Sequence, residues 1–131
     1  MSAIETLRKH AAELREVAGI EVTVTEEGDR IYIVLSKVHI PGSAFRLRES
    51  DILVHADRLY PLSAMDMFWA EVDLIRSDGS VPAGAEQVEQ YLGRQWRRFS
   101  WHRNGIWNPA GNPLLDHYAF VESRFTREVQ K

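Results

Sequence analysis

Residues 21–38 read EVTVTEEGDRIYIVLSKV, and they are the clearest guide to the architecture of this chain. Residues 21–25 and 30–38 are two runs rich in Val, Ile and Thr, which are residue types that fit a pleated, half-buried strand. The four residues between the runs are Glu26, Glu27, Gly28 and Asp29, a polar group typical of a turn. The pattern therefore predicts a β-hairpin.

On the N-terminal side of this hairpin, the sequence predicts one amphipathic helix of about four turns. Ser2 followed by Glu5 has the spacing of a capping box, in which the two side chains satisfy free N–H groups at the start of a helix. Apolar residues then recur at steps of three and four until Gly19. They are Ile4, Leu7, Ala11, Leu14 and Ala18.

On the C-terminal side, the sequence predicts two more strands. Ile-Pro-Gly-Ser at 40–43 ends the second strand of the hairpin. A third strand is expected at 51–56 and a fourth at 67–75, where Phe68 and Val72 share a face if the chain alternates. The helix is thus followed by a four-stranded antiparallel meander.

The rest of the chain divides into an irregular segment and a final helix. Residues 76–107 contain many Gly, Pro, Ser and Asp residues, with one short helix expected at 86–92. Asn112 can cap a helix that begins at Pro113, and an apolar stripe follows. Its members are Leu114, Leu115, Tyr118, Val121 and Phe125. This order of elements predicts an α+β fold.

Composition is that of an ordinary globular domain and excludes several chemistries. The chain has 131 residues, 44% apolar and 27% charged, which fits a single domain at 1–131. It has no long apolar run, and its charged N-terminus is unlike a secretory signal, so we expect a cytoplasmic protein. The absence of cysteine removes disulfides, thiolate metal sites and thiol nucleophiles.

Other residues that bear on metals and cofactors are scattered. Four histidines, His10, His39, His55 and His117, lie far apart in the sequence, and no His-Glu-x-x-His or glycine-rich phosphate motif occurs. We therefore expect no metal site and no bound cofactor. Four acidic residues lie around the fourth predicted strand, where we expect a solvated acidic face. They are Asp66, Glu71, Asp73 and Asp78.

Functional side chains are densest at residues 94–107, which read RQWRRFSWHRNGIW. One interpretation is structural: the aromatic rings supply core area and the arginines lie over them in solvent. Another is catalytic, because Ser100 and His102 project to the same side of an extended backbone and form a nucleophile and a base. The sequence suggests no third orienting residue. The alternative for this pair is a serine that caps a backbone group and a histidine at the rim.

Several short motifs, in this order, resemble the ubiquitin-conjugating superfamily, and most closely its bacterial branch called prokaryotic family E. They are Tyr-Pro at 60–61, Met-Phe-Trp at 67–69, Arg-Phe-Ser-Trp-His at 98–102 and Trp-Asn-Pro at 107–109. The resemblance implies the fold of that superfamily and places Ser100 at or beside the position of its catalytic cysteine. This chain departs from the pattern in lacking both the cysteine and the His-Pro-Asn tripeptide.

The resemblance also implies a reaction and partners. Ser100 is expected to accept a ubiquitin-like modifier from an adenylating (activating) enzyme as an oxyester and to pass it to a target amine, with His102 as base. Asn104, or backbone N–H groups around Gly105, would hold the oxyanion. Trp101 and Trp107 would exclude water and, together with three arginines, would bind the modifier's tail. These arginines are Arg97, Arg98 and Arg103. A deconjugating peptidase and a role in antiphage defence follow from the same resemblance.

Two other functions remain open from the sequence. The domain can be a conjugating-enzyme variant without catalysis that binds a ubiquitin-like protein. Alternatively, the arginines and aromatic rings of residues 94–107 can bind single-stranded nucleic acid by stacking and backbone contacts. The net charge of -3 argues against nucleic acid as the partner.

Overall fold

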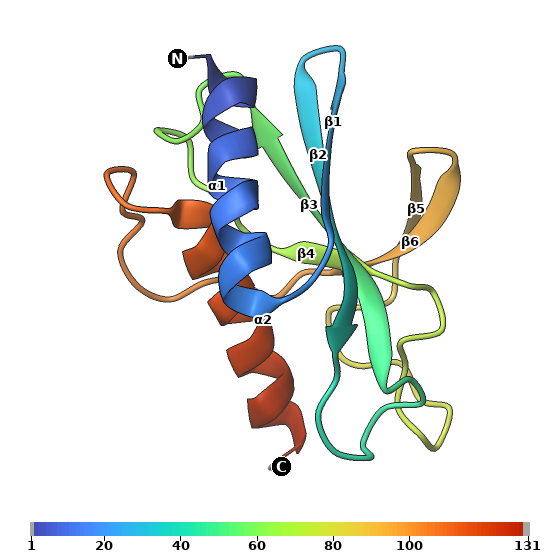
Figure 1. The fold of residues 1–131 in the computed structure, drawn as a ribbon. Helices are drawn as coiled ribbons and strands as arrows, with labels where there is room; N and C mark the ends of the chain where they lie inside the picture. Colours follow the sequence, from blue (N-terminus) through green and yellow to red (C-terminus); the bar gives the residue numbers. More distant parts are fainter. Residues whose placement is uncertain (1, 130–131) are drawn as a thin grey trace.

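The computed structural model describes residues 2–129 and confirms the α+β class. Two helices, α1 (Ala3–Ala18) and α2 (Pro113–Val129), lie on the same side of a single sheet (Figure 1). The strands are β1 (Val22–Glu27), β2 (Arg30–His39), β3 (Glu49–Asp57), β4 (Phe68–Ala70), β5 (Val88–Tyr91) and β6 (Arg94–Phe99). They pair antiparallel in the order β1-β2-β3-β4-β6-β5.

Both helices begin as the sequence predicts. At α1 the Ser2 hydroxyl accepts from the N–H of Glu5, and the Glu5 carboxylate accepts from the N–H of Ser2, so the capping box is present. At α2 the side-chain oxygen of Asn112 accepts from the N–H of Leu115 at 3.0 Å. The side-chain amide of Asn112 also donates to the carbonyl of His10, which joins the start of α2 to α1.

The predicted hairpin is confirmed as β1 and β2, which pair from Val22 with Leu35 to Glu27 with Arg30. The third predicted strand, 51–56, lies within β3. The fourth is shorter than expected, because β4 ends at Ala70. Beyond it the N–H of Leu74 donates to the carbonyl of Glu71 at 3.0 Å, and this turn takes Val72 out of the strand.

The short helix expected at 86–92 is wrong, and so is the irregular conformation expected at 94–99. Residues Val88–Tyr91 and Arg94–Phe99 form a hairpin that extends the predicted four-stranded sheet to six strands. β6 lies between β5 and β4, with Phe99 opposite Phe68. The hairpin thus brings the segment that follows it, from Ser100 onward, to the start of β4.

The main core lies between the helices and one face of the sheet. Leu7 and Leu14 of α1 and Phe125 of α2 are buried against sheet residues that include Phe68 and Phe99. The rings of Phe68 and Phe99 stack with their centroids 5.1 Å apart. A second, smaller cluster of Leu53, Trp69 and Trp96 forms separately from it. Within residues 2–129, no helix is long and apolar enough to cross a lipid bilayer.

Candidate functional site

Burial alternates along residues 99–102, where the chain leaves β6. Phe99 and Trp101 are buried in the main core, whereas Ser100 is half-buried and His102 is exposed. Side chains alternate between the two sides of an extended backbone, so the burial pattern places Ser100 and His102 on the side away from the core. The segment is tied to the loop before β5 by the N–H of Ser100, which donates to the carbonyl of Gly84 at 2.9 Å.

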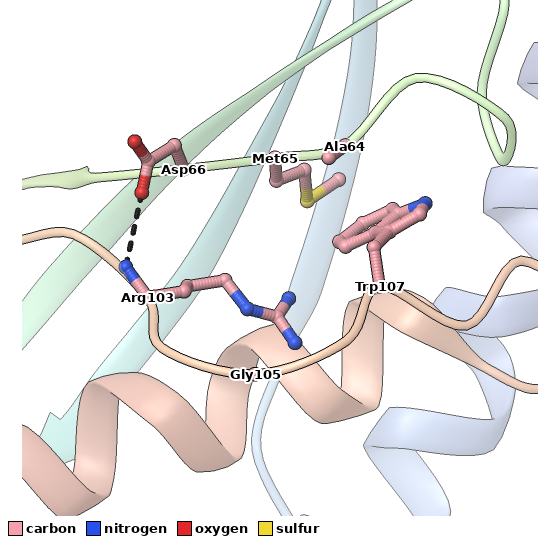
Figure 2. A pocket seen from close by; sticks show the side chains of 6 residues that line it. All are labelled: Ala64, Met65, Asp66, Arg103, Gly105 and Trp107. Carbon is pink, nitrogen blue, oxygen red and sulfur yellow. Dashed lines mark hydrogen bonds between the residues drawn. The ribbon is translucent and has the colours of Figure 1, made fainter.

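His102 contacts an acidic residue that lies far away in the sequence. Its ring Nδ1 is 2.5 Å from Oδ2 of Asp66, and the two side chains are 65% and 51% exposed. The other carboxylate oxygen of Asp66 accepts from the backbone N–H of Arg103 at 3.1 Å (Figure 2). Asp66 is therefore part of the site rather than only of the predicted acidic face. Across residues 2–129, no hydrogen bond joins the Ser100 hydroxyl to His102.

A pocket of about 230 Å³ lies beside His102 and Asp66 (Figure 2). It is lined by Ala64, Met65, Asp66, Arg103, Gly105 and Trp107. The guanidinium of Arg103 extends toward Trp107, with its Cζ 5.0 Å from the centre of that ring. The indole N–H of Trp107 donates to the carbonyl of Pro61 at 2.6 Å. The pocket thus has an acidic side, a cationic side and an aromatic wall.

His117 supports this pocket from inside the protein. Its Nε2 lies 2.8 Å from the carbonyl oxygen of Met67, and its Nδ1 is 3.4 Å from NH1 of Arg103. A carbonyl oxygen can only accept, so the Nε2 carries the proton and the Nδ1 lone pair faces the guanidinium. Burial lowers the pKa of His117 to about 4. A neutral histidine therefore links α2 to both the 64–67 segment and Arg103.

Asn104 and Gly105 form the exposed part of the loop between Arg103 and Trp107. Within the described residues 2–129, the Asn104 side chain makes no hydrogen bond, and Gly105 has φ of +117°, a conformation open to glycine but strained for other residues. The next residue, Ile106, is 91% exposed. The amide of Asn104 is thus free to turn toward a ligand.

Trp101 and Arg97, both predicted to contact a modifier's tail, lie inside the protein. Trp101 is 6% exposed, and its indole N–H donates to the carbonyl of Ala83 at 2.9 Å. Arg97 is 9% exposed and donates to the carbonyls of Val72 and Ala85. The interpretation of the aromatic rings as core residues is therefore correct for Trp101. These two side chains hold the segment in place and are closed to a tail.

Arg98 is separated from Arg103, although the two were predicted to act together. It lines another cavity, of about 290 Å³, with residues of the sheet that include His55, Trp69 and Tyr91. Its guanidinium pairs with Glu89 at 3.2 Å, and Glu89 also accepts from the indole N–H of Trp69. Of the three predicted tail-binding arginines, only Arg103 lines the pocket beside His102.

Residues 2–129 contain no group of three or more His, Cys, Asp or Glu side chains placed to hold a metal ion. The comparisons with known proteins point in one direction. The model of a family described as prokaryotic E2 family E matches residues 8–128, which is nearly the whole chain. No curated protein and no solved structure gives a significant match.

Proposed function

Since the chain belongs to prokaryotic E2 family E, we propose that it carries a ubiquitin-like modifier as an ester on Ser100 and transfers it to an amine. An activating enzyme and a modifier are the partners that such a family implies in general. The observation that carries the proposal is the exposed imidazole of His102, held against Asp66 two residues beyond Ser100. We place the reaction in the bacterial cytoplasm, in a pathway of defence against phage that includes a deconjugating peptidase.

In the loading step, Ser100 Oγ attacks the C-terminal carbonyl carbon of the activated modifier, and the Oγ–H proton passes to His102. The new C–O bond forms as the bond from that carbon to the activating enzyme's leaving group breaks, and the leaving group takes the proton from His102. In the transfer step, the target amine attacks the ester carbon and gives up a proton to His102, and as the bond from that carbon to Ser100 Oγ breaks, His102 delivers this proton to Oγ. The serine and histidine return to their starting states.

The loop after His102 supplies the other functions that this chemistry needs. The side-chain amide of Asn104, which makes no hydrogen bond within residues 2–129, or a backbone N–H near Gly105 donates to the oxyanion. Loss of one such donor typically lowers the rate by about 10²- to 10³-fold. Arg103 donates to carbonyl groups of the modifier's tail in the pocket, while Trp107 covers the tail and limits access of water to the ester.

The test is to mix the protein with its activating enzyme, the modifier and ATP, and to separate the products by gel electrophoresis. We expect an adduct that resists thiol reductant and is cleaved by hydroxylamine or alkali. Ser100→Ala abolishes this adduct. Ser100→Cys is the matched variant, because its adduct is a thioester that a thiol reductant cleaves. An ester adduct that persists in Ser100→Ala contradicts the proposal.

A binding role without catalysis is the second candidate, favoured by the absence of a hydrogen bond between Ser100 and His102 in residues 2–129. Catalytic hydrogen bonds are often loose in free enzymes and tighten with substrate, so this absence does not decide against transfer. The same mixture separates the two functions. A modifier that co-elutes with the protein in gel filtration, but forms no adduct with it, favours the binding role.

A further inference from the structure

Asp66 contacts two residues of the site that are adjacent in the sequence, His102 and Arg103. One oxygen lies 2.5 Å from Nδ1 of His102, and the other accepts from the backbone N–H of Arg103 at 3.1 Å. The second contact holds the plane of the carboxylate, since both oxygens now have fixed partners. Asp66 therefore presents one oxygen to the imidazole in a defined direction, as Figure 2 shows for the Arg103 side of this arrangement.

The segment that carries Asp66 is itself held on both sides. Met65 is 4% exposed and packs in the main core. The carbonyl of Met67 accepts from Nε2 of the buried His117, which belongs to α2. An exposed aspartate is thus anchored by the buried Met65 and by the bond from the buried His117 to Met67, and its position does not depend on its own burial.

The contact determines which ring nitrogen of His102 carries a proton. A carboxylate oxygen accepts hydrogen bonds, so the neutral imidazole must donate through Nδ1–H. The lone pair is then on Nε2, at the other edge of an exposed ring. Without Asp66, both tautomers of an exposed imidazole are populated, and the form with Nε2–H cannot accept a proton at that edge.

We propose that Asp66 is a positioning residue that keeps His102 in the Nδ1–H tautomer, so that Nε2 is free to take the Ser100 proton. This inference rests on the proposed transfer reaction and adds a third member to it. During loading, Nε2 gains the proton from Ser100 Oγ while Nδ1–H stays bonded to Asp66, and Nε2 then delivers the same proton to the leaving group. Because both side chains are largely exposed, solvent screens their charges, and orientation is the larger effect.

The first experiment reads the tautomer directly by ¹⁵N NMR of the free protein, with the His102 signals assigned by their loss in His102→Gln. We expect a protonated Nδ1 and a bare Nε2 in the wild type, and a shift toward Nε2–H in Asp66→Asn. The control is Asp73→Asn, which makes the same charge change at an exposed residue. The Asp73 side chain forms no hydrogen bond within residues 2–129. Equal tautomer populations in all three proteins overturn the inference.

The second experiment measures the rate of ester formation. Asp66→Asn should slow loading by about 10- to 100-fold, which is no more than the roughly 10²- to 10⁴-fold that general-base assistance contributes, because Asp66 positions the base and does not replace it. The double variant with His102→Ala should be no slower than His102→Ala alone, because Asp66 acts through His102. If the losses of loading rate in the two single variants add up in the double variant, the inference is contradicted, even where Ser100 accepts the modifier. If the wild type forms no ester, the proposed function fails, and the NMR result alone then decides whether Asp66 sets the tautomer.

Discussion

His117 connects the candidate site to the core through both of its ring nitrogens. The carbonyl of Met67 accepts from Nε2–H, and Nδ1 faces the guanidinium of Arg103. Protonation of Nδ1 would place two cations in contact at a side chain that is 0% exposed. The arrangement therefore requires a neutral imidazole, and the anchored position of Asp66 depends on it through the same segment.

This requirement makes stability depend on pH. The pKa of His117 is about 4 in the folded protein and about 6.5 in the unfolded chain, so between these values the unfolded state binds the additional proton. The contribution of His117 to the free energy of unfolding is fully present above pH 6.5. It is lost as pH falls toward 4, by about 3 kcal/mol in total. Urea denaturation at several pH values in this range should show the decline in the free energy of unfolding.

His117→Gln provides the comparison, because a glutamine amide can donate to Met67 and accept from Arg103 without titrating. Its free energy of unfolding should fall less steeply with decreasing pH than that of the wild type. Burial also lowers the pKa of His55 to about 4, which adds a decline of the same sign in both proteins. Parallel curves for the two proteins would show that His117 does not titrate on unfolding.

At the scale of elements, Arg97 fixes β6 to two segments that precede the hairpin, one just after β4 and one just before β5. Its Nε donates to the carbonyl of Val72 at 2.8 Å, and its NH1 donates to the carbonyl of Ala85 at 2.7 Å. Arg97→Ala should lower the free energy of unfolding by about 3 kcal/mol, since two charge-assisted bonds are lost and the carbonyls of Val72 and Ala85 lose this partner. Denaturant titration measures this loss.

Arg94 on the same strand is the matched control for Arg97. Its guanidinium pairs with Asp51 at 3.0 Å, but its side chain is 43% exposed. An exposed ion pair contributes about 0–1 kcal/mol, so Arg94→Ala should have a small effect. Equal losses from the two variants would mean that the bonds to Val72 and Ala85 contribute little, and that Arg97 is free for another role.

The hairpin of β5 and β6 shows why part of the fold could not be predicted from the sequence. Its turn is formed by Leu92 and Gly93, with φ of +55° and +73°. Positive φ at both positions is typical of a two-residue hairpin turn, where Asn-Gly is the usual sequence and leucine is strained. Because leucine is not typical of such a turn, the sequence did not indicate a turn at Leu92 and Gly93. Gly28 and the polar residues around it, in contrast, indicated the first hairpin.

Only part of the candidate site could be predicted from the sequence, because some of its residues are neighbours in the sequence and others meet only through long-range contacts. Ser100, His102 and Arg103 lie close together in the sequence, so local spacing is sufficient to suggest them. Asp66 reaches His102 from 36 residues earlier, and no periodicity or motif marks such a contact. Burial of Trp101 and Arg97 also depends on the long-range packing of β6 against β4 and on the loop before β5. The sequence alone therefore does not distinguish Trp101 and Arg97, which are buried, from Trp107 and Arg103, which line the pocket.

At the scale of the whole molecule, the distribution of charge bears on nucleic acid as a partner. The chain has a net charge of -3, so its overall field repels a polyanion. Three of the four arginines of residues 94–107 already have partners: Arg94 and Arg98 pair with carboxylates, and Arg97 is bonded to carbonyls. Of the aromatic rings there, Trp96 is 0% exposed and Trp101 is in the core.

We therefore expect no salt-dependent binding to single-stranded nucleic acid. Fluorescence anisotropy of a labelled oligothymidine should remain unchanged when the protein is added at low salt, where phosphate contacts are strongest. Arg103 and the half-buried Trp107 are the pair still open to a base, so Arg103→Ala is the variant to compare. Binding that weakens steeply with salt and disappears in Arg103→Ala would reassign the pocket beside His102 to a nucleic acid.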